Sequence, residues 1–359
     1  MSRRASTGKE RIRQFVNGTT TVPGWRADLL VIASLGMLVL IMPVVAETLM
    51  GFRGVAANVL IWMLFAVAFN LLLGYAGLLS FGHAMFFGGG MYVLAITMRE
   101  LGPVMIVVGA PLALLSMGLL AYVIARLIAE KGEIYFALLT IAFGELVWYI
   151  GNSNPGGLTG GNDGLSSGML PPFVEAFRGN LQVVVGSVQV DIYWAVALLF
   201  VVGVFLLYRI VRSPFGRTLL TIKENEQLAR SIGVNTYRYK VHTFVISAIF
   251  TAAAGCMLVV VNQSVATSQL TWHTSGEVVI MSILGGINTF AGPMFGVFLW
   301  FLAEESLSGL QAIGELRHFW QFGLGLLFVT VILVAPRTGG YGAIKGGIRR
   351  IANELLGGK

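Results

Sequence analysis

The sequence predicts an all-α protein that crosses a membrane several times. Of its 359 residues, 56% are apolar and only 11% are Asp, Glu, Lys or Arg, whereas a soluble domain carries about 25% charged residues. The mean hydropathy of +0.80 agrees with this class. So few charges cannot cover the surface of a soluble fold. The composition therefore excludes a soluble globular enzyme, a disordered chain and a nucleic-acid-binding domain.

Runs of apolar residues define the expected membrane spans, because a spanning helix needs about 20 mostly apolar residues. Six runs come close to this length, and four less regular segments raise the expected number of crossings to about ten. The six clear runs are residues 29–46, 54–73, 103–125, 191–208, 241–261 and 319–335. The four less regular segments are residues 84–98, 134–150, 277–287 and 292–304.

The basic residues predict the orientation of these spans. If the N-terminus is cytoplasmic and the spans alternate, segments 1–27, 126–133, 209–240 and 336–359 face inward and hold 20 of the 24 Lys and Arg residues. This bias follows the positive-inside rule and places both termini in the cytoplasm. It requires an even number of crossings, but it does not separate eight from ten.

The domain organisation follows from this orientation. We expect a basic cytoplasmic arm at 1–27, one helical membrane domain over 28–336 and a basic cytoplasmic tail at 337–359. The longest outer loop is then 151–190. The single cysteine, Cys256, excludes a disulfide framework. It lies in an apolar run, where an inert buried thiol is expected.

Two regions interrupt the apolar sequence with glycine and polar residues. They read GYAGLLSFGHAMFFGGG (74–90) and LGGINTFAGPMFG (284–296). In lipid, non-helical backbone is tolerated only where protein buries it or water reaches it, and interrupted helices near the midplane indicate a transport path. We therefore expect two broken helices that line such a path. The alternative is close helix packing, for example through Gly292 and Gly296.

Polar residues within the spans are candidates for this path, because an ionisable residue in a span suggests a function. His83 would serve as a proton relay or ligand, or as a hydrogen-bonded structural residue, which is the commoner case. Glu145 lies near the predicted outer end of its span and would reach either the path or the interface. No His, Cys, Asp or Glu set has metal-site spacing, so we expect no metal. The candidate path residues are Asn70, Ser80, His83, Glu145 and Asn288.

The loop 209–240 contains a short helix with signals at both ends. Asn225 is a good N-cap, Glu226 favours the helix dipole in the first turn, and Gly233 suits the position after the last turn. Residues 226–232 form about two turns, too few to be stable alone in water. An apolar edge is expected from Leu228, Ala229 and Ile232.

A doubly capped short helix with an exposed apolar edge suggests a contact for a soluble protein partner. The alternative is a helix that lies on the membrane surface or in solvent without a partner.

The stretch SPFGRTLLTIKENEQLARSIGVNTYRYKVHTFVISA (213–248) closely resembles the cytoplasmic loop of permease subunits from branched-chain amino-acid ABC importers. The matching features are Ser213-Pro214, Gly216-Arg217, Glu224-Asn225-Glu226, Ala229, Gly233, Lys240, Phe244 and Ser247-Ala248. Blocks 74–92, 135–146, 158–165 and 281–296 resemble the same family, in order, so the resemblance covers roughly 54–336. The long outer loop with LTGGNDGL is similar to the second of the family's two paralogous permeases.

The resemblance implies a subunit in a bacterial or archaeal cytoplasmic (inner) membrane. Its partners would be a second permease, two cytoplasmic ABC ATPases and an extracytoplasmic substrate-binding protein, with no nucleic acid. This chain has no G-x-x-x-x-G-K-[ST], so ATP would bind the ATPases, and we expect neither a cofactor nor an enzymatic activity here. Helix 226–232 would be the coupling helix. The expected ATPase-coupling residues are Gly216, Arg217, Glu224, Asn225, Glu226, Ala229 and Gly233.

Three alternatives stay open, of which the first is also a transporter. A urea, short-amide or simple-sugar permease of the same superfamily would share several of these blocks. An intramembrane enzyme acting on lipid would need a nucleophile–base set or a metal site, which His83 and Glu145 alone do not supply. A stand-alone channel would not explain the capped loop.

Overall fold

The chain divides into two units, Met1–Ile41 and Met42–Lys359. The α2 helix (Gly24–Met50) contains the described part of the first unit and continues into the second. The expected cytoplasmic tail, most of the basic arm and nearly all of the expected span 319–335 lie outside the described residues. The computed structural model describes residues 24–50, 55–101, 106–165, 181–182, 189–190, 192–308, 325–326 and 329–330.

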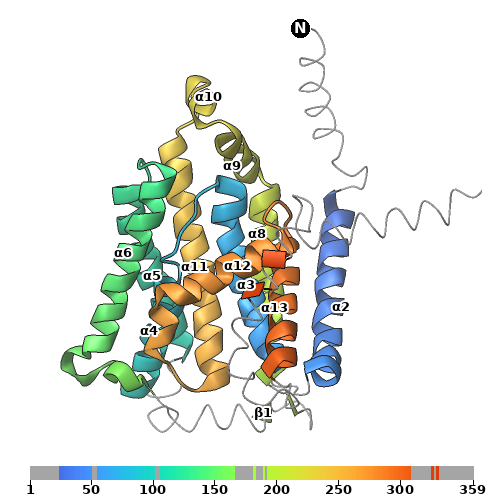
Figure 1. Ribbon diagram of the computed structural model, residues 1–359. Coiled ribbons are helices and arrows are strands. Elements are labelled where there is room, and N and C mark those ends of the chain that lie inside the picture. The colour runs from blue at the N-terminus through green and yellow to red at the C-terminus, as the bar shows by residue number, and fades with distance from the viewer. Residues whose placement is uncertain are drawn as a thin grey trace, which may run out of the picture. The chain divides into compact units, whose positions relative to one another are not determined.

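Helices make up most of the described part of the second unit (Figure 1). In chain order the elements up to the outer loop are α3 (Val55–Asn70), the π-helical turn η1 (Leu71–Tyr75), α4 (Ala84–Leu101), α5 (Ile106–Ile128), α6 (Glu133–Ser153), η3 (Pro155–Gly157) and η4 (Gly161–Asp163). After it come α8 (Ile192–Arg212), α9 (Pro214–Glu224), α10 (Glu226–Ser231), α11 (Thr236–Asn262), η6 (Thr267–Leu270), α12 (Trp272–Gly285) and α13 (Gly292–Ser308).

Six helical segments within the described residues are long and apolar enough to cross a membrane. They belong to α2, α3 with η1, α5, α6, α8 and α11. The predicted helical membrane bundle is thereby confirmed. The number of crossings stays a prediction.

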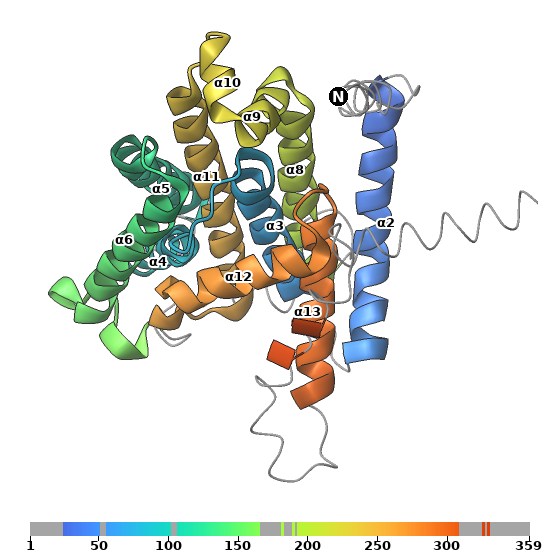
Figure 2. The same ribbon diagram turned by 45° about the horizontal axis from the view of Figure 1, so that its top comes forward.

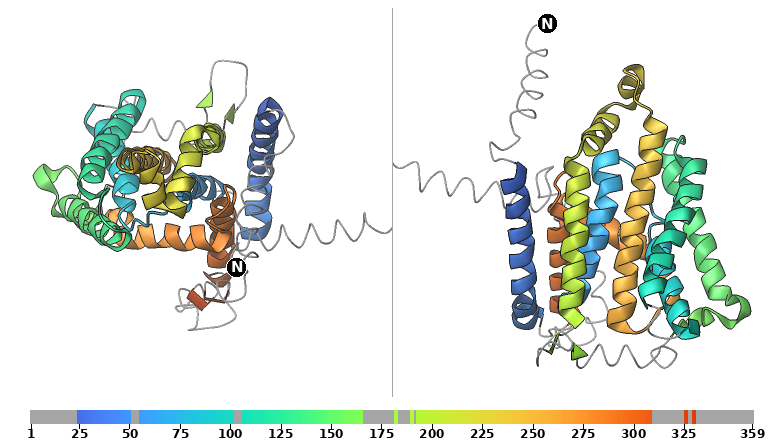
Figure 3. Two further views of the ribbon diagram at one scale, coloured as in Figure 1. Left: turned by 90° about the horizontal axis from the view of Figure 1, so that it is seen from above. Right: turned by 180° about the vertical axis from the view of Figure 1, so that it is seen from behind.

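The core of the bundle is built around α3 and α11. Helix α3 is apolar on all sides and buried along nearly its whole length, as expected for a helix surrounded by others. It contacts α8, α11, α12 and α13, while α4 and α5 pack on the other side of α11. Seen from behind, the order is α8, α3, α11 and α5 (Figure 3).

Helix α4 carries three consecutive glycines because three neighbours approach its backbone closely. A Cβ on Gly88 would come within 2.6 Å of the Leu270 side chain. A Cβ on Gly89 would lie 2.5 Å from Met117 Sδ, and one on Gly90 would lie 2.6 Å from the Ala252 carbonyl. Glycine inside a helix costs about 1 kcal/mol relative to alanine. Here the close contacts of α4 with η6, α5 and α11 offset that cost.

Helix α12 runs obliquely across the upright helices (Figure 2). Its 14 residues extend over about 21 Å, less than the roughly 30 Å of a bilayer core. It contacts α3, α4 and α13. Glycine permits the close approach of α12 and α13, because a Cβ on Gly296 would collide with the Met281 carbonyl oxygen. Close helix packing, the alternative interpretation of Gly292 and Gly296, therefore applies at the second interruption.

Strand pairing occurs beyond α6, in the predicted outer loop. The two-residue strands β1 (Leu181–Gln182) and β2 (Gln189–Val190) pair antiparallel, with Leu181 opposite Val190. Leu165 and Val265 exchange two backbone hydrogen bonds of 2.8 Å. These bonds fix the end of the described loop 154–165 to the segment after α11.

Candidate functional site

The turn between α8 and α9 positions the segment that carries the candidate ATPase-coupling residues. Ser213 has extended backbone and Pro214 occupies the first turn of α9, where its missing N–H costs nothing. Gly216 is buried, and a Cβ there would collide with the Val211 carbonyl oxygen. Glycine thus allows α9 to fold back closely on the end of α8. Arg217 and Glu224 lie on the exposed side of α9.

Helix α10 forms with the caps that the sequence predicts. The Asn225 side chain accepts a 2.9 Å hydrogen bond from the Leu228 N–H. At the other end Gly233 has a φ of +88°. The Gly233 N–H donates to the Arg230 carbonyl and the Val234 N–H to the Ala229 carbonyl. This pair of bonds is the Schellman motif, so both predicted helix ends are confirmed.

Ion pairs fix α10 against α11. Glu226 Oε2 lies 2.8 Å from Lys240 Nζ, and Glu226 Oε1 lies 2.8 Å from Arg230 Nη2. Arg230 Nε also donates to Thr236 Oγ1 at 2.9 Å. Burial alone would raise the pKa of the Glu226 carboxyl, but the hydrogen bonds from Lys240 and Arg230 hold that pKa below its usual value. We call these four residues the α10 clamp.

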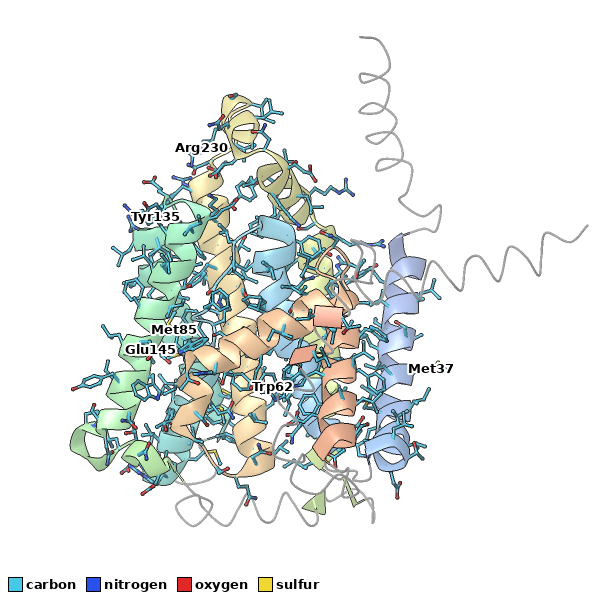
Figure 4. The ribbon with its side chains drawn as sticks, in the orientation of Figure 1. Met37, Trp62, Met85, Tyr135, Glu145 and Arg230 are labelled. Carbon is cyan, nitrogen blue, oxygen red and sulfur yellow. The ribbon has the colours of Figure 1, made fainter. Side chains whose placement is uncertain are left out.

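The two sides of α10 have different exposure. Leu228 is 58% exposed and Ile232 is 67% exposed. Ala229, which we placed on the same apolar edge, is fully buried. That part of the expectation is wrong, because a two-turn helix that contacts α9 and α11 must turn one side toward them, and the smallest apolar residue takes that side. The exposed apolar contact therefore consists of Leu228 and Ile232. Figure 4 shows Arg230 at this end of the bundle.

His83 lies in a closed hydrogen-bond network. Its Nε2 is 3.0 Å from Ser247 Oγ, and its Nδ1 is 2.8 Å from Ser80 Oγ. Ser247 already donates its hydroxyl proton to the Ala68 carbonyl, so it accepts from Nε2–H. The structure thus places both His83 and Ser80, which have no exposed surface, among packed side chains.

Aromatic rings enclose the same histidine. Its ring makes edge contacts with Phe69, Phe86 and Phe244, at centroid distances of 5.2–5.5 Å. Of the two interpretations of His83, this structure supports the structural one. The hydrogen bonds join the first interruption to α3 and α11.

The two interruptions touch each other. Asn70 Nδ2 donates to the Thr289 carbonyl at 3.2 Å, across 219 residues of sequence. Gly74 lies so close to the Ile287 carbonyl that a Cβ would collide with it. Asn70 is buried, whereas Asn288 is exposed at the turn of the second interruption. Asn70 and Asn288 therefore belong to one junction.

Lys223 connects this junction to α9 and was not among the site residues predicted from the sequence. Its Nζ donates to the Gly74 carbonyl at 2.7 Å and to Asn288 Oδ1 at 3.3 Å. Burial lowers the pKa of the Lys223 ammonium. The spacing of Leu219 and Lys223, four residues apart on one helix, could have placed Lys223 on the buried side of α9.

A polar cavity of about 480 Å³ lies beside Lys223. It borders the first interruption, α9, α10 and the beginnings of α6 and α11. Its lining residues are Ala76, Gly77, Leu78, Glu133, Ile222, Lys223, Glu224, Asn225, Glu226 and Lys240. The candidate coupling segment and the first interruption thus share one polar groove.

Glu145 lies on α6 (Figure 4). It is half-buried. The neighbouring Gly144 faces the first interruption, where its Cβ would lie 3.3 Å from Gly82 Cα. On the same side of α6, Thr140 Oγ1 accepts a 3.2 Å hydrogen bond from the Phe81 N–H. The structure therefore brings α6 into contact with the first interruption through Gly144 and Thr140.

Comparison with known proteins agrees with this architecture. The chain is 28% identical over 326 residues to the high-affinity branched-chain amino acid transport system permease protein LivM of Salmonella typhimurium, covering 84% of this chain and 73% of that protein. It is 25% identical to the Escherichia coli LivM, covering 79% and 68%. A probable LivM of Methanocaldococcus jannaschii is 22% identical, covering 69% and 80%. No solved structure matches the chain.

A family model covers most of the membrane domain. Residues 51–335 match the model described as branched-chain amino acid transport system / permease component. The match includes both interruptions, the α10 clamp and the Lys223 junction. The chain therefore belongs to the family of permease components of branched-chain amino acid transport systems.

Proposed function

We propose that this chain is the transmembrane permease subunit of a binding-protein-dependent ABC importer for branched-chain amino acids, in the cytoplasmic membrane of a bacterium or archaeon. The observation that carries the proposal is α10. This helix is capped at both ends, is fixed by the clamp and presents Leu228 and Ile232 outward. An exposed apolar pair on a rigid short helix suits the groove of a soluble partner.

The proposed partners divide the work. Two cytoplasmic ATPases bind and hydrolyse ATP, a second permease completes the path, and an extracytoplasmic binding protein delivers the amino acid. When ATP closes the ATPases, their grooves move α10. The clamp passes this motion to α11 as a rigid-body displacement.

The orientation we propose has the α10 end of the bundle in the cytoplasm. The Tyr237 hydroxyl contacts the Arg126 carbonyl at 3.4 Å, so the basic segments 126–133 and 209–240 lie at the same end. Asn162 and Asp163 are exposed on the loop at the other end of α6. These two residues are available to the binding protein.

The substrate assignment is tested by reconstituted uptake. Proteoliposomes should contain this chain, the second permease, the ATPases and the binding protein. We expect ATP-dependent uptake of leucine, isoleucine and valine, and no uptake of urea, short amides or ribose. A double variant, Leu228→Asp with Ile232→Asp, should abolish this uptake. Uptake of urea or an amide in preference to leucine would instead favour the urea-type alternative.

A further inference from the structure

Lys223 lies between the candidate coupling helix and the two interruptions. It is on the last turn of α9, three residues before α10 begins. Its Nζ bonds at 2.7 Å to the Gly74 carbonyl in the first interruption and at 3.3 Å to Asn288 Oδ1 in the second. These partners are 149 and 65 residues away in sequence. One ammonium group therefore joins three segments.

The aliphatic part of Lys223 also has a fitted position. A Cβ on Gly77 would lie 3.0 Å from Lys223 Cγ, and Gly77 has a φ of +74°. A side chain at position 77 would be strained in this conformation and would crowd the lysine stem. The backbone of the first interruption thus turns at Gly77 and packs against the Lys223 side chain.

The two interruptions are in contact even without Lys223. Asn70 Nδ2 bonds to the Thr289 carbonyl at 3.2 Å, and the Gly74 backbone packs on the Ile287 carbonyl. A tie from α9 to this junction acts on both interruptions together. If α9 moves far enough to break the Lys223 hydrogen bonds, both interruptions lose their tie to α9.

We propose that Lys223 is a positioning residue that holds both interruptions of the transport path to α9 and releases them when α9 and α10 are displaced. This inference rests on the proposed function. With Lys223 bonded, segments 74–83 and 286–291 are held to α9. When the ATPases displace α9 and α10, the two bonds break and the segments rearrange.

The test compares Lys223→Met, which keeps the stem but removes the donors, with Lys223→Arg, which keeps charge and donors. Lys131 is an exposed lysine at the same end of the bundle, so Lys131→Met is the matched control. Asn288→Ala is a second, milder variant at an exposed site. Each reconstituted complex is measured for ATPase assembly, for basal ATP hydrolysis and for leucine uptake per ATP hydrolysed.

We expect Lys223→Met to assemble and hydrolyse ATP at the basal rate, but to lose uptake per ATP by about tenfold, the effect of one lost charge-assisted hydrogen bond. Lys223→Arg and Lys131→Met should stay near the wild-type ratio, and Asn288→Ala should fall between. An unchanged uptake per ATP in both Lys223→Met and Asn288→Ala would overturn the proposal. If Lys223→Met fails to assemble, an unchanged uptake per ATP in Asn288→Ala would also overturn it. If the wild-type complex itself fails to assemble or transport, the proposed function fails instead.

Discussion

The Glu226 carboxylate lies 2.8 Å from the Lys240 ammonium, which is 14 residues further along the chain and nearly buried. The contact joins α10 to the beginning of α11, a helix that reaches the opposite end of the bundle (Figure 1). A buried ammonium needs a partner, because leaving one unpaired is costly. The position of α10 is therefore set within the chain, before any partner binds.

Replacing Glu226 by Lys should loosen α10. The new ammonium would face Lys240 and Arg230. The loss of the charged hydrogen bonds should lower the free energy of unfolding by about 1–2 kcal/mol, a small value because Glu226 is partly exposed. Limited proteolysis should then cut 209–240 faster, and ATPase pull-down should fall while membrane insertion persists. Gln227→Lys, at an exposed neighbour on the same helix, is the control for proteolysis. Wild-type proteolysis and pull-down for Glu226→Lys would contradict a structural role of the clamp.

The stabilisation from Glu226 should depend on pH in a definite direction. The pKa of its carboxyl is held below the usual value, because the hydrogen bonds from Lys240 and Arg230 outweigh the effect of burial. The contribution is therefore present above the unfolded-state pKa and is lost as the pH falls through the folded-state pKa. Thermal unfolding of the wild type and of Glu226→Gln should differ most near neutral pH and converge in acid. A difference that grows on acidification would show that the sign is wrong.

Gly233→Ala isolates the conformational requirement of the α10 C-terminus. No atom lies within 4 Å of the position that a Cβ on residue 233 would take, but the φ of Gly233 is +88°. The substitution should therefore lower the free energy of unfolding by about 1 kcal/mol through backbone strain alone. Hydrogen exchange at the amides of 228–234 should accelerate. Gly132→Ala is the control, since its φ is −61° and the nearest atom is at 3.8 Å. Equal exchange in the two variants would contradict the assigned cap.

Thiol labelling should distinguish the two interruptions. Cys256 is buried, and the background variant Cys256→Ala removes it. In this background Asn288→Cys should react with a small water-soluble maleimide, because Asn288 is exposed, whereas Ser80→Cys should stay unreactive without nucleotide. Fast labelling at Ser80 without nucleotide would place it on an open path and contradict the packed network around His83.

Local signals were sufficient to predict some of the site, and long-range contacts set the rest. The α10 caps depend on Asn225 and Gly233, which act within a few residues, so the sequence predicts them. The His83–Ser247 bond spans 164 residues, and nothing near either residue indicates the other. The helical period groups Ala229 with Leu228 and Ile232, but it does not tell a side that faces the bundle from one that faces a partner.

The membrane spans follow the same division. Apolar length predicts α2, α3, α5, α8 and α11, because a span is a property of one segment. The oblique path of α12 depends on its packing against α3, α4 and α13 and has no sequence signal of its own. The contact between the two interruptions is likewise tertiary.

We propose that α10 docks a cytoplasmic ATPase, and site-directed cross-linking tests this docking most directly. A cysteine replacing Ile232, 67% exposed, would be placed in the Cys256→Ala background and compared with one replacing Asn162 at the other end of α6. After treatment with a bifunctional thiol reagent, we expect an adduct between the ATPase and the Ile232→Cys variant, and none with Asn162→Cys. An ATPase adduct at Asn162→Cys and none at Ile232→Cys would contradict both the coupling role of α10 and the orientation of the bundle.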